Sequence, residues 1–596
     1  MPQFVIDDPK RVQVVYDRGE KEYRHDHPEL TTRRDIAANP DDPNIVRNIT
    51  RELQLAQVPG YRYCKYVPRD KFDKIVTPEV VLQLISRLHC FEAERKAGTL
   101  AELAADIYFG KGDRGPCRKL LCVLIQIGRE NDLKKLMEQG MTDDCLPLKT
   151  EQHNGQNEHQ LSCRRHGFDH KVINEYTMPD TRERFSQWSQ KLMPLYITWH
   201  RDSRGAEHTS ASPKHRHYVL EDTDPIPLKP THNQRGRAEG GFSEVVPVNI
   251  EASSKSLALT GFRSDDEIFA LKTLRKHPHD DPIKRRMDFD MEIRTSVFAD
   301  YHSKNYSGHQ PGAIMHMIPL LATFEIQDPQ QDDSEYHLLF DWAEGNLQQF
   351  WKSNETMVRD LDWLKWTAKQ FCELARALHC IHNDLERMPS ANTYSNLYGR
   401  HGDIKPSNFL YFKLRDGSKI LVMSDFGLGR LHSKISKSNA DPRNMPMTIS
   451  YRAPEFDLKD GKISPRSDVY SMGCVFLEHI TWFLRGKTGV DDFASRRLEI
   501  DKKYKFELDT FFELSDDERT ATTKGKVKEW IEELKQDEAC CEYLFKMLNL
   551  IEKRMLDPNS DTRIHAGELT NELKKMLRCG ELSKSFYTKH WTKSMF

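Results

Sequence analysis

The stretch His401-Gly402-Asp403-Ile404-Lys405-Pro406-Ser407-Asn408, followed by Phe409-Leu410, decides how the chain is interpreted. Further along, the apolar run Ile420-Leu421-Val422-Met423 leads into Ser424-Asp425-Phe426-Gly427. A short apolar run of this kind is typical of a buried strand. A single Asp or Lys is usually a solvated surface charge. Four polar residues in fixed order, followed by a predicted strand and Asp-Phe-Gly, are much harder to obtain by chance.

The two segments resemble the catalytic loop and the metal-binding loop of eukaryotic protein kinases. Phosphoryl transfer is catalysed mainly by positioning and by neutralising charge on the phosphate oxygens. The resemblance implies that Asp403 is the base near the attacking hydroxyl and that Lys405 holds the transferred phosphate. It also implies that Asn408 and Asp425 bind Mg²⁺, which prefers hard oxygen ligands. The expected cofactors are therefore ATP and Mg²⁺.

A second part of the resemblance lies in the strand-like segment Ile268-Phe269-Ala270-Leu271-Lys272. Alternation along a strand places Ala270 and Lys272 on one face. In the kinase pattern this lysine holds the nucleotide phosphates and is oriented by a glutamate on the next helix. Glu292 is favoured for that role over the neighbouring aspartates, because helical spacing places it on the same face as Phe289.

The segment Ala238-Glu239-Gly240-Gly241-Phe242-Ser243-Glu244-Val245 resembles the glycine-rich loop that covers the phosphates. Ala238 and Ser243 stand where the family has glycines, so a plain hairpin remains the alternative. The resemblance also implies an adenine site with Phe340 at its rear and Asp341-Trp342-Ala343 as the hinge between lobes. The residues expected to contact the nucleotide are Gly240, Gly241, Ser243, Val245, Ala270, Lys272, Phe340, Asp341, Ala343 and Leu410.

Downstream, Thr448-Ile449-Ser450-Tyr451-Arg452-Ala453-Pro454-Glu455 resembles the substrate-docking segment of the family. Thr448 together with Lys405 is typical of kinases that phosphorylate serine and threonine. In the same pattern, Glu455 is expected to form a buried ion pair with Arg563.

Three further features concern the region around the catalytic loop. Asp468 is expected to hold the backbone of that loop. Gly402 stands where most kinases carry an arginine that pairs with a phosphate on the activation segment, so activity is expected not to depend on such phosphorylation. A polar insertion lies between Asn383 and Arg400, immediately before His401. This arrangement, with the sequence Tyr398-Gly399-Arg400-His401-Gly402-Asp403, is similar to that in large fungal kinase-like proteins.

Composition restricts the partners. The 596 residues include 89 Lys and Arg against 91 Asp and Glu, so a net charge of -2 gives no reason to expect nucleic acid or an anionic membrane. The 12 cysteines are scattered without metal-site or disulfide spacing, which favours a reducing compartment. No run reaches the roughly 18 apolar residues of a membrane helix. A cytoplasmic location is expected, with the nucleus also open.

These observations predict an α+β fold, with a two-lobed kinase domain preceded by a mostly α-helical domain. The small lobe should contain an antiparallel sheet and one helix, and the large lobe should be mostly helical. Apolar residues at helical spacing, beginning after the cap Thr77-Pro78, support the helical domain. The predicted boundaries are a poorly ordered N-terminus over 1–50, the helical domain over 51–200, a linker over 201–232, the kinase domain over 233–578 and a tail over 579–596.

The function expected from these features is that of an ATP-dependent serine/threonine protein kinase, acting on protein substrates in intracellular signalling. The N-terminal helical domain is expected to bind a protein partner. The alternative is a catalytically weak kinase-fold scaffold, which the irregular glycine loop and Gly402 support. Small-molecule kinases of similar fold are disfavoured, because the segment ending at Glu455 builds a platform for a peptide.

Overall fold

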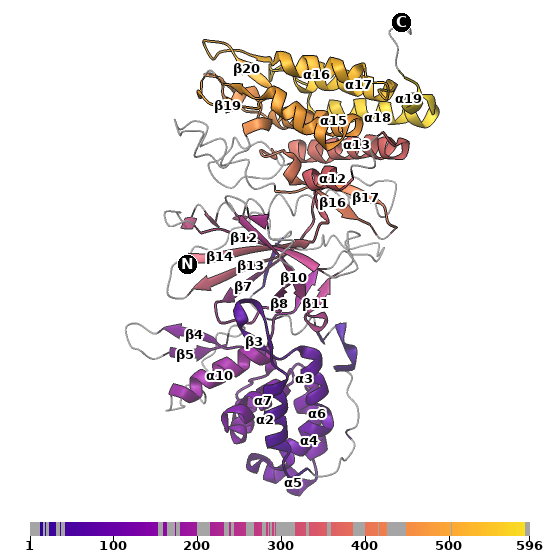
Figure 1. The fold of residues 1–596 in the computed structure, drawn as a ribbon. Helices are drawn as coiled ribbons and strands as arrows, with labels where there is room; N and C mark the ends of the chain where they lie inside the picture. Colours follow the sequence, from indigo (N-terminus) through magenta and orange to yellow (C-terminus); the bar gives the residue numbers. More distant parts are fainter. Residues whose placement is uncertain are drawn as a thin grey trace.

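The computed structural model describes most of the chain. The described residues are 12–15, 18, 23–24, 26–30, 36, 42–152, 159–163, 173, 179–199, 215–231, 238–239, 243–257, 268–276, 282–283, 285–286, 289–290, 293, 316–328, 333–354, 359–384, 400–414, 416–425, 449–501 and 503–590. Figure 1 shows them as a helical N-terminal unit, a curved sheet and a helical C-terminal unit stacked in that order. The fold is α+β, as expected.

The N-terminal unit is built around α7 (Arg118–Ile127), all of whose residues are buried. The predicted helix start at Thr77 is confirmed, since the Thr77 side chain accepts a hydrogen bond from the Val80 amide and Pro78 lies in the first turn. Two hairpins, β2 (Val58–Pro59) with β3 (Lys65–Tyr66) and β4 (Lys149–Gln152) with β5 (His159–Ser162), accompany the helices. The other helices are α2 (Ile45–Leu55), α3 (Arg69–Ile75), α4 (Pro78–Ser86), α5 (Glu92–Ala97), α6 (Leu100–Phe109), α8 (Leu133–Glu138) and α10 (Pro179–Leu192).

The central sheet has eight strands. Its strand order is β1-β7-β13-β14-β12-β10-β8, and β9 also pairs with β10. The bounds are β1 (Val12–Val15), β7 (His215–Glu221), β8 (Leu228–Pro230), β9 (Ala238–Glu239), β10 (Ser243–Ile250), β12 (Ile268–Leu274), β13 (Leu320–Asp328) and β14 (Asp333–Asp341). The described positions between 282 and 293 are helical, at the place where the helix after β12 was expected.

The sheet differs from the prediction at its edge. The antiparallel set β9, β10, β12, β14 and β13 was expected, but β7 and β1 are added in parallel beyond β13, so the sheet is mixed. Residues 215–221 and 228–230 are therefore strands of this sheet, whereas 201–232 was predicted to be a linker. Residues 12–15 are likewise a strand, within the segment that was predicted to be poorly ordered. Pairing with distant segments, which no local pattern reports, accounts for both differences.

The two faces of the sheet are covered by different parts of the chain. Alternation along β12 turns Ala270 toward the core shared with the C-terminal unit and turns Phe269 and Leu271 the other way. That second, outer face is covered by the segment around Leu195 and Ile197 at the end of the N-terminal unit. β6 (Ile197–Trp199) also pairs in parallel with β11 (Lys255–Leu257), next to the sheet. The end of the N-terminal unit and the outer face of the sheet thus share one apolar cluster.

The C-terminal unit is organised around α15 (Arg466–Arg497), which is buried from Ser467 to Leu484 and passes through the core. The hairpin of β16 (Phe409–Lys413) and β17 (Lys419–Met423) connects it to the sheet, and β15 (Gly345–Asn346) pairs with β16. The remaining elements are α12 (Leu347–Ser353), α13 (Leu361–Asp384), β18 (Glu499–Ile500), β19 (Glu507–Leu508), β20 (Phe512–Leu514), β21 (Ala521–Thr523), α16 (Gly525–Lys535), α17 (Glu542–Leu550), α18 (Ala566–Leu582) and α19 (Ser585–Thr588).

The described part of the predicted C-terminal tail, residues 579–590, packs on this unit. α18 continues beyond residue 578, and Phe586 and Tyr587 of α19 are buried against Tyr543. The boundary at 579 was therefore too early, because two aromatic residues close to the terminus complete the core. Among the helices that the structure describes, none combines the length and the apolarity needed to cross a lipid bilayer.

Candidate active site

The β16–β17 hairpin brings the two predicted metal ligands together. Phe409 pairs with Met423 across the antiparallel ladder, so Asn408 before β16 and Asp425 after β17 lie at the same end of the hairpin. The amide and the hydroxyl of Ser424 both donate hydrogen bonds to the backbone carbonyl of Asn408, over 2.9 and 3.1 Å. The hairpin register therefore accounts for the closeness of two segments that are separate in sequence.

Asp403 is held by both of its predicted neighbours. The Asn408 side-chain amide donates to the Asp403 backbone carbonyl at 2.8 Å and to its carboxylate at 2.9 Å. The Lys405 ammonium lies 2.9 Å from the same carboxylate oxygen. Three residues of the predicted catalytic loop thus meet around one carboxylate, and a lysine stands where a transferred phosphate would need a cation.

Asp468 at the start of α15 holds the backbone of this loop, as predicted. Its carboxylate accepts hydrogen bonds from the amides of His401 and Gly402, over 2.8 and 2.9 Å, and contacts His382 Nε2 at 2.9 Å. Burial alone would raise the pKa of Asp468, but the hydrogen bond to His382 and the nearby Arg400 and His401 lower it. Asp468 therefore stays charged and keeps both amides bound.

Gly402 has a backbone φ of 80°, in the left-handed region. A residue without a Cβ adopts this conformation without strain. The glycine at this position therefore suits the backbone that presents two consecutive amides to Asp468.

Lys272 joins the sheet to the helical unit at the site. Its ammonium lies 2.5 Å from Asp425 Oδ1, although the two residues are far apart in sequence. Burial alone would raise the pKa of Asp425, but the ammonium groups of Lys272 and Lys405 lower it. Asp425 also has a φ of 68°, a conformation that non-glycine residues rarely adopt and that is concentrated at functional sites.

Five of the predicted nucleotide residues belong to, or pack against, one large apolar cluster. Ala270 and Phe340 are buried in it and are paired across β12 and β14. Three half-buried residues from other elements pack against the same cluster, namely Val245, Ala343 and Leu410. Apolar side chains of this type are what a flat base would need around it. Ser243 begins β10, and the buried Asp341 ends β14 where the chain leaves the sheet.

The donor set fits a divalent cation of the magnesium class. Asn408 uses its side-chain nitrogen for both contacts to Asp403, so its amide oxygen faces another direction. That oxygen and the charged Asp425 carboxylate are hard ligands, the type that Mg²⁺ prefers. A bound cation would neutralise charge on nucleotide phosphates, and these two residues would hold it.

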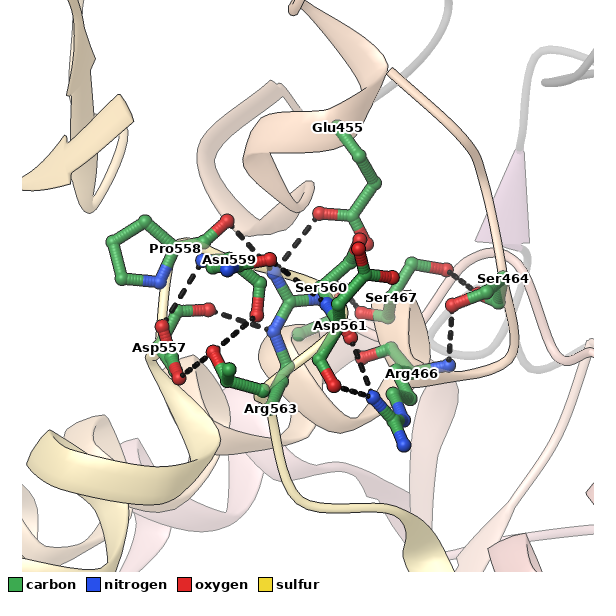
Figure 2. Close-up of polar contacts among 12 residues, drawn as sticks. Glu455, Ser464, Arg466, Ser467, Asp557, Pro558, Asn559, Ser560, Asp561 and Arg563 are labelled. Carbon is green, nitrogen blue, oxygen red and sulfur yellow. Dashed lines mark hydrogen bonds and ion pairs between the residues drawn. The ribbon is translucent and has the colours of Figure 1, made fainter. Parts of the chain in front are cut away.

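The predicted ion pair between Glu455 and Arg563 is confirmed (Figure 2). The two guanidinium nitrogens of Arg563 donate to the two Glu455 oxygens at 2.7 and 2.9 Å, and both side chains are almost fully buried. Arg563 also donates to the backbone carbonyls of Asp557 and Arg466. The pair therefore ties the end of the predicted docking segment to the loop before α18.

Some predicted positions lie outside the described residues. These are Gly240, Gly241, Glu292, Phe426 and Thr448. The strands on either side of the glycine pair are present, since Glu239 pairs with Glu244 and Ala238 with Val245. The contact of His382 with Asp468 was not predicted, because α13 and α15 are distant in sequence and a histidine near a helix end carries no distinctive signal.

Known proteins resemble the region that forms this site. Residues 256–572, more than half of the chain, match the family described as protein kinase domain. Serine/threonine-protein kinase ppk13 of Schizosaccharomyces pombe is 27% identical over 274 residues, which cover 40% of this chain and 69% of that protein.

Two plant proteins match a shorter part of the chain. Cyclin-dependent kinase E-1 of Arabidopsis thaliana is 28% identical over 151 residues, or 25% of this chain and 29% of that protein. Mitogen-activated protein kinase 5 of the same plant is 29% identical over 157 residues, or 26% of this chain and 35% of that protein. The chain therefore spans about a third of the length of either plant kinase.

Proposed function

Because this chain belongs to the protein kinase domain family, we propose that it transfers the γ-phosphate of ATP to serine and threonine hydroxyls of protein substrates. The observation that carries the proposal is the meeting of Lys272, Asp425 and the Asp403 loop at one place. These groups come from the sheet and from the helical unit, and their closeness supports the polar roles that phosphoryl transfer needs.

Each residue has a defined task in this proposal. Lys272 and Lys405 hold phosphate oxygens, and Asn408 and Asp425 hold Mg²⁺. Asp403 accepts the proton of the attacking hydroxyl, and its hydrogen bond from Asn408 and its contact with Lys405 fix its orientation toward that hydroxyl. Positioning and charge neutralisation then supply the rate acceleration.

The proposal extends to substrates, partners and location. Thr448 and Lys405 favour serine and threonine over tyrosine, and the segment ending at Glu455 favours a protein substrate. The N-terminal helical unit is a candidate surface for a protein partner, and a role in signalling follows from protein phosphorylation itself. The scattered cysteines support a reducing compartment, the cytoplasm or the nucleus.

A transfer assay with γ-labelled ATP and a generic basic protein tests the proposal. The full-length protein should label serine and threonine in the presence of Mg²⁺, and chelation of the metal should abolish the labelling. The Asp425→Ala variant serves as the blank. If the wild type labels no more than this blank while it still binds ATP, the protein is a scaffold and not an enzyme.

Asp468→Asn should lower kcat by roughly ten- to a hundredfold, because a displacement of about 1 Å in a catalytic group can cost that much. The variant loses the charge that binds the amides of His401 and Gly402, so the Asp403 loop is held less firmly. Steady-state kinetics with varied ATP measures the effect. Asp460→Asn, an exposed residue before the same helix, is the matched control and should retain the wild-type rate.

A further inference from the structure

The strand β7, which lies between β1 and β13 in the sheet, carries a buried histidine. His217 is paired with Thr323 in the parallel ladder between β7 and β13, and its ring is fully buried. Its Nδ1 lies 3.0 Å from the Thr323 hydroxyl and its Nε2 lies 3.1 Å from Glu325 Oε2. Burial lowers the pKa of His217, which favours a neutral ring that donates to Glu325 and accepts from Thr323. Both ring nitrogens are thereby satisfied.

Glu325 connects this histidine to the helical segment 282–293. The same oxygen that contacts His217 lies 2.8 Å from the guanidinium of Arg286, and the other oxygen accepts from Ser334 and Gln327. Burial alone would raise the pKa of Glu325, but the hydrogen bond from His217 and the charge of Arg286 lower it to about 2. One charged carboxylate thus holds the added strand and the helical segment together.

Aromatic contacts also join β7 and β14 to the helical segment. Phe289 of the helical segment packs against the His217 ring at 5.6 Å between centroids and stacks on Tyr336 at 4.5 Å. Arg286 also lies over the Tyr336 ring at 5.7 Å. Arg286 and Phe289 are therefore fixed by contacts with His217, Glu325 and Tyr336. Glu292, the predicted partner of Lys272, lies between Asp290 and Ile293 in the sequence and outside the described residues.

The opposite face of β7 is fixed by the N-terminal unit. The Tyr218 hydroxyl accepts from the Thr198 amide and donates to the Tyr196 carbonyl, and its ring stacks on Phe324. Just after β7, Asp224 forms a fully buried ion pair with Arg18. Because successive side chains of a strand point to opposite faces, Tyr218 contacts the N-terminal unit while His217 contacts the helical segment.

We propose that His217 is a positioning residue, through which the N-terminal unit holds the helical segment 282–293 in the orientation that phosphoryl transfer requires. The proposal rests on the proposed kinase function. In this proposal, activity depends on the N-terminal unit. β7 connects that unit to the helical segment, and the Glu325 carboxylate binds both His217 and Arg286. Loss of the contact between His217 and Glu325 should then lower kcat, although neither residue belongs to the candidate active site.

The test uses the full chain and compares three single variants and one double variant of the network. His217→Phe keeps the ring packing on Phe289 but cannot donate to Glu325, and Arg286→Met removes the other partner. Each should lower kcat roughly three- to tenfold, the range of coupling through a packed network. The kcat of the double variant should be no lower than that of the less active single variant, because both changes act through Glu325. His217→Gln, which retains an N–H donor, should recover much of the rate.

Hydrogen exchange of peptides covering 282–293 supplies a second readout, and exchange there should accelerate in His217→Phe and Arg286→Met. His479→Phe is the matched control, since His479 is also fully buried with both ring nitrogens bonded, to Trp351 and Thr367. It should lower stability yet leave exchange at 282–293 unchanged.

Unaltered exchange at 282–293 in Arg286→Met and His217→Phe, or additive losses in the double variant, would overturn the proposal. If His217→Phe does not fold, Arg286→Met and His217→Gln carry the exchange comparison. If the wild type transfers no phosphate, the proposed function fails, whereas the exchange data still decide whether His217 holds the segment.

Discussion

Asp425→Ala is expected to reduce the kcat of phosphotransfer by roughly a thousandfold, the upper range for removal of one group that stabilises developing charge. The Asp425 carboxylate is the point where Lys272 from the sheet meets the β16–β17 hairpin from the helical unit. Its removal eliminates one of the two proposed metal ligands and the anion that orients Lys272. Labelled-phosphate transfer at saturating ATP, over reaction times long enough to detect slow turnover, measures the loss.

The control for Asp425→Ala comes from the same hairpin. Asp416 is exposed in the turn between β16 and β17 and accepts hydrogen bonds from Ser418. Asp416→Ala should keep a rate within about twofold of the wild type, since surface substitutions away from special features have small effects. A loss below tenfold in Asp425→Ala, with the Asp416 control intact, would show that Asp425 does not hold an essential metal.

Arg563→Met is expected to lower the free energy of unfolding by about 3–5 kcal/mol, because it leaves the Glu455 carboxylate buried without its bidentate partner. The substitution also removes donors to the backbone carbonyls of Asp557 and Arg466. Methionine retains much of the side-chain volume, so the loss reports charge and hydrogen bonding more than packing. Urea unfolding followed by tryptophan fluorescence measures the change.

An exposed pair provides the comparison for Arg563→Met. Arg554 and Glu568 form an ion pair at 2.7 Å with both side chains 43% exposed. Arg554→Met should cost no more than about 1 kcal/mol, as is usual for surface pairs. Similar losses in the two variants would mean that burial of the Glu455–Arg563 pair contributes little.

The site could be predicted from sequence because its polar residues occur in short, ordered segments. Asp403, Lys405 and Asn408 lie within one loop, so their contacts follow once that loop is identified. Asp425 follows from the strand before it. The ion pair between Glu455 and Arg563 was predicted only because both residues stand in the motif of the family, since nothing local connects them.

The added part of the sheet could not be predicted in the same way. Residues 215–221 read His-Arg-His-Tyr-Val-Leu-Glu and follow a segment rich in polar and basic residues, which favoured a tether. Their strand character depends on pairing with β13, more than 100 residues away in sequence. His217 in particular resembles a solvated charge until Thr323 and Glu325 are placed beside it. Non-local pairing, and not intrinsic propensity, determines this edge.

The apolar outer face of the sheet has a practical consequence for dissecting the protein. A fragment that starts at residue 233 would lack Leu195, Ile197 and Tyr218, and would expose Phe324, Leu339 and their neighbours to water. A solvent-exposed apolar surface of that kind promotes aggregation. The shortest fragment that is stable on its own should therefore begin well upstream of residue 256, where the match to the kinase family starts. A truncation made at that boundary would change solubility, and its effect on activity could not be interpreted as regulation.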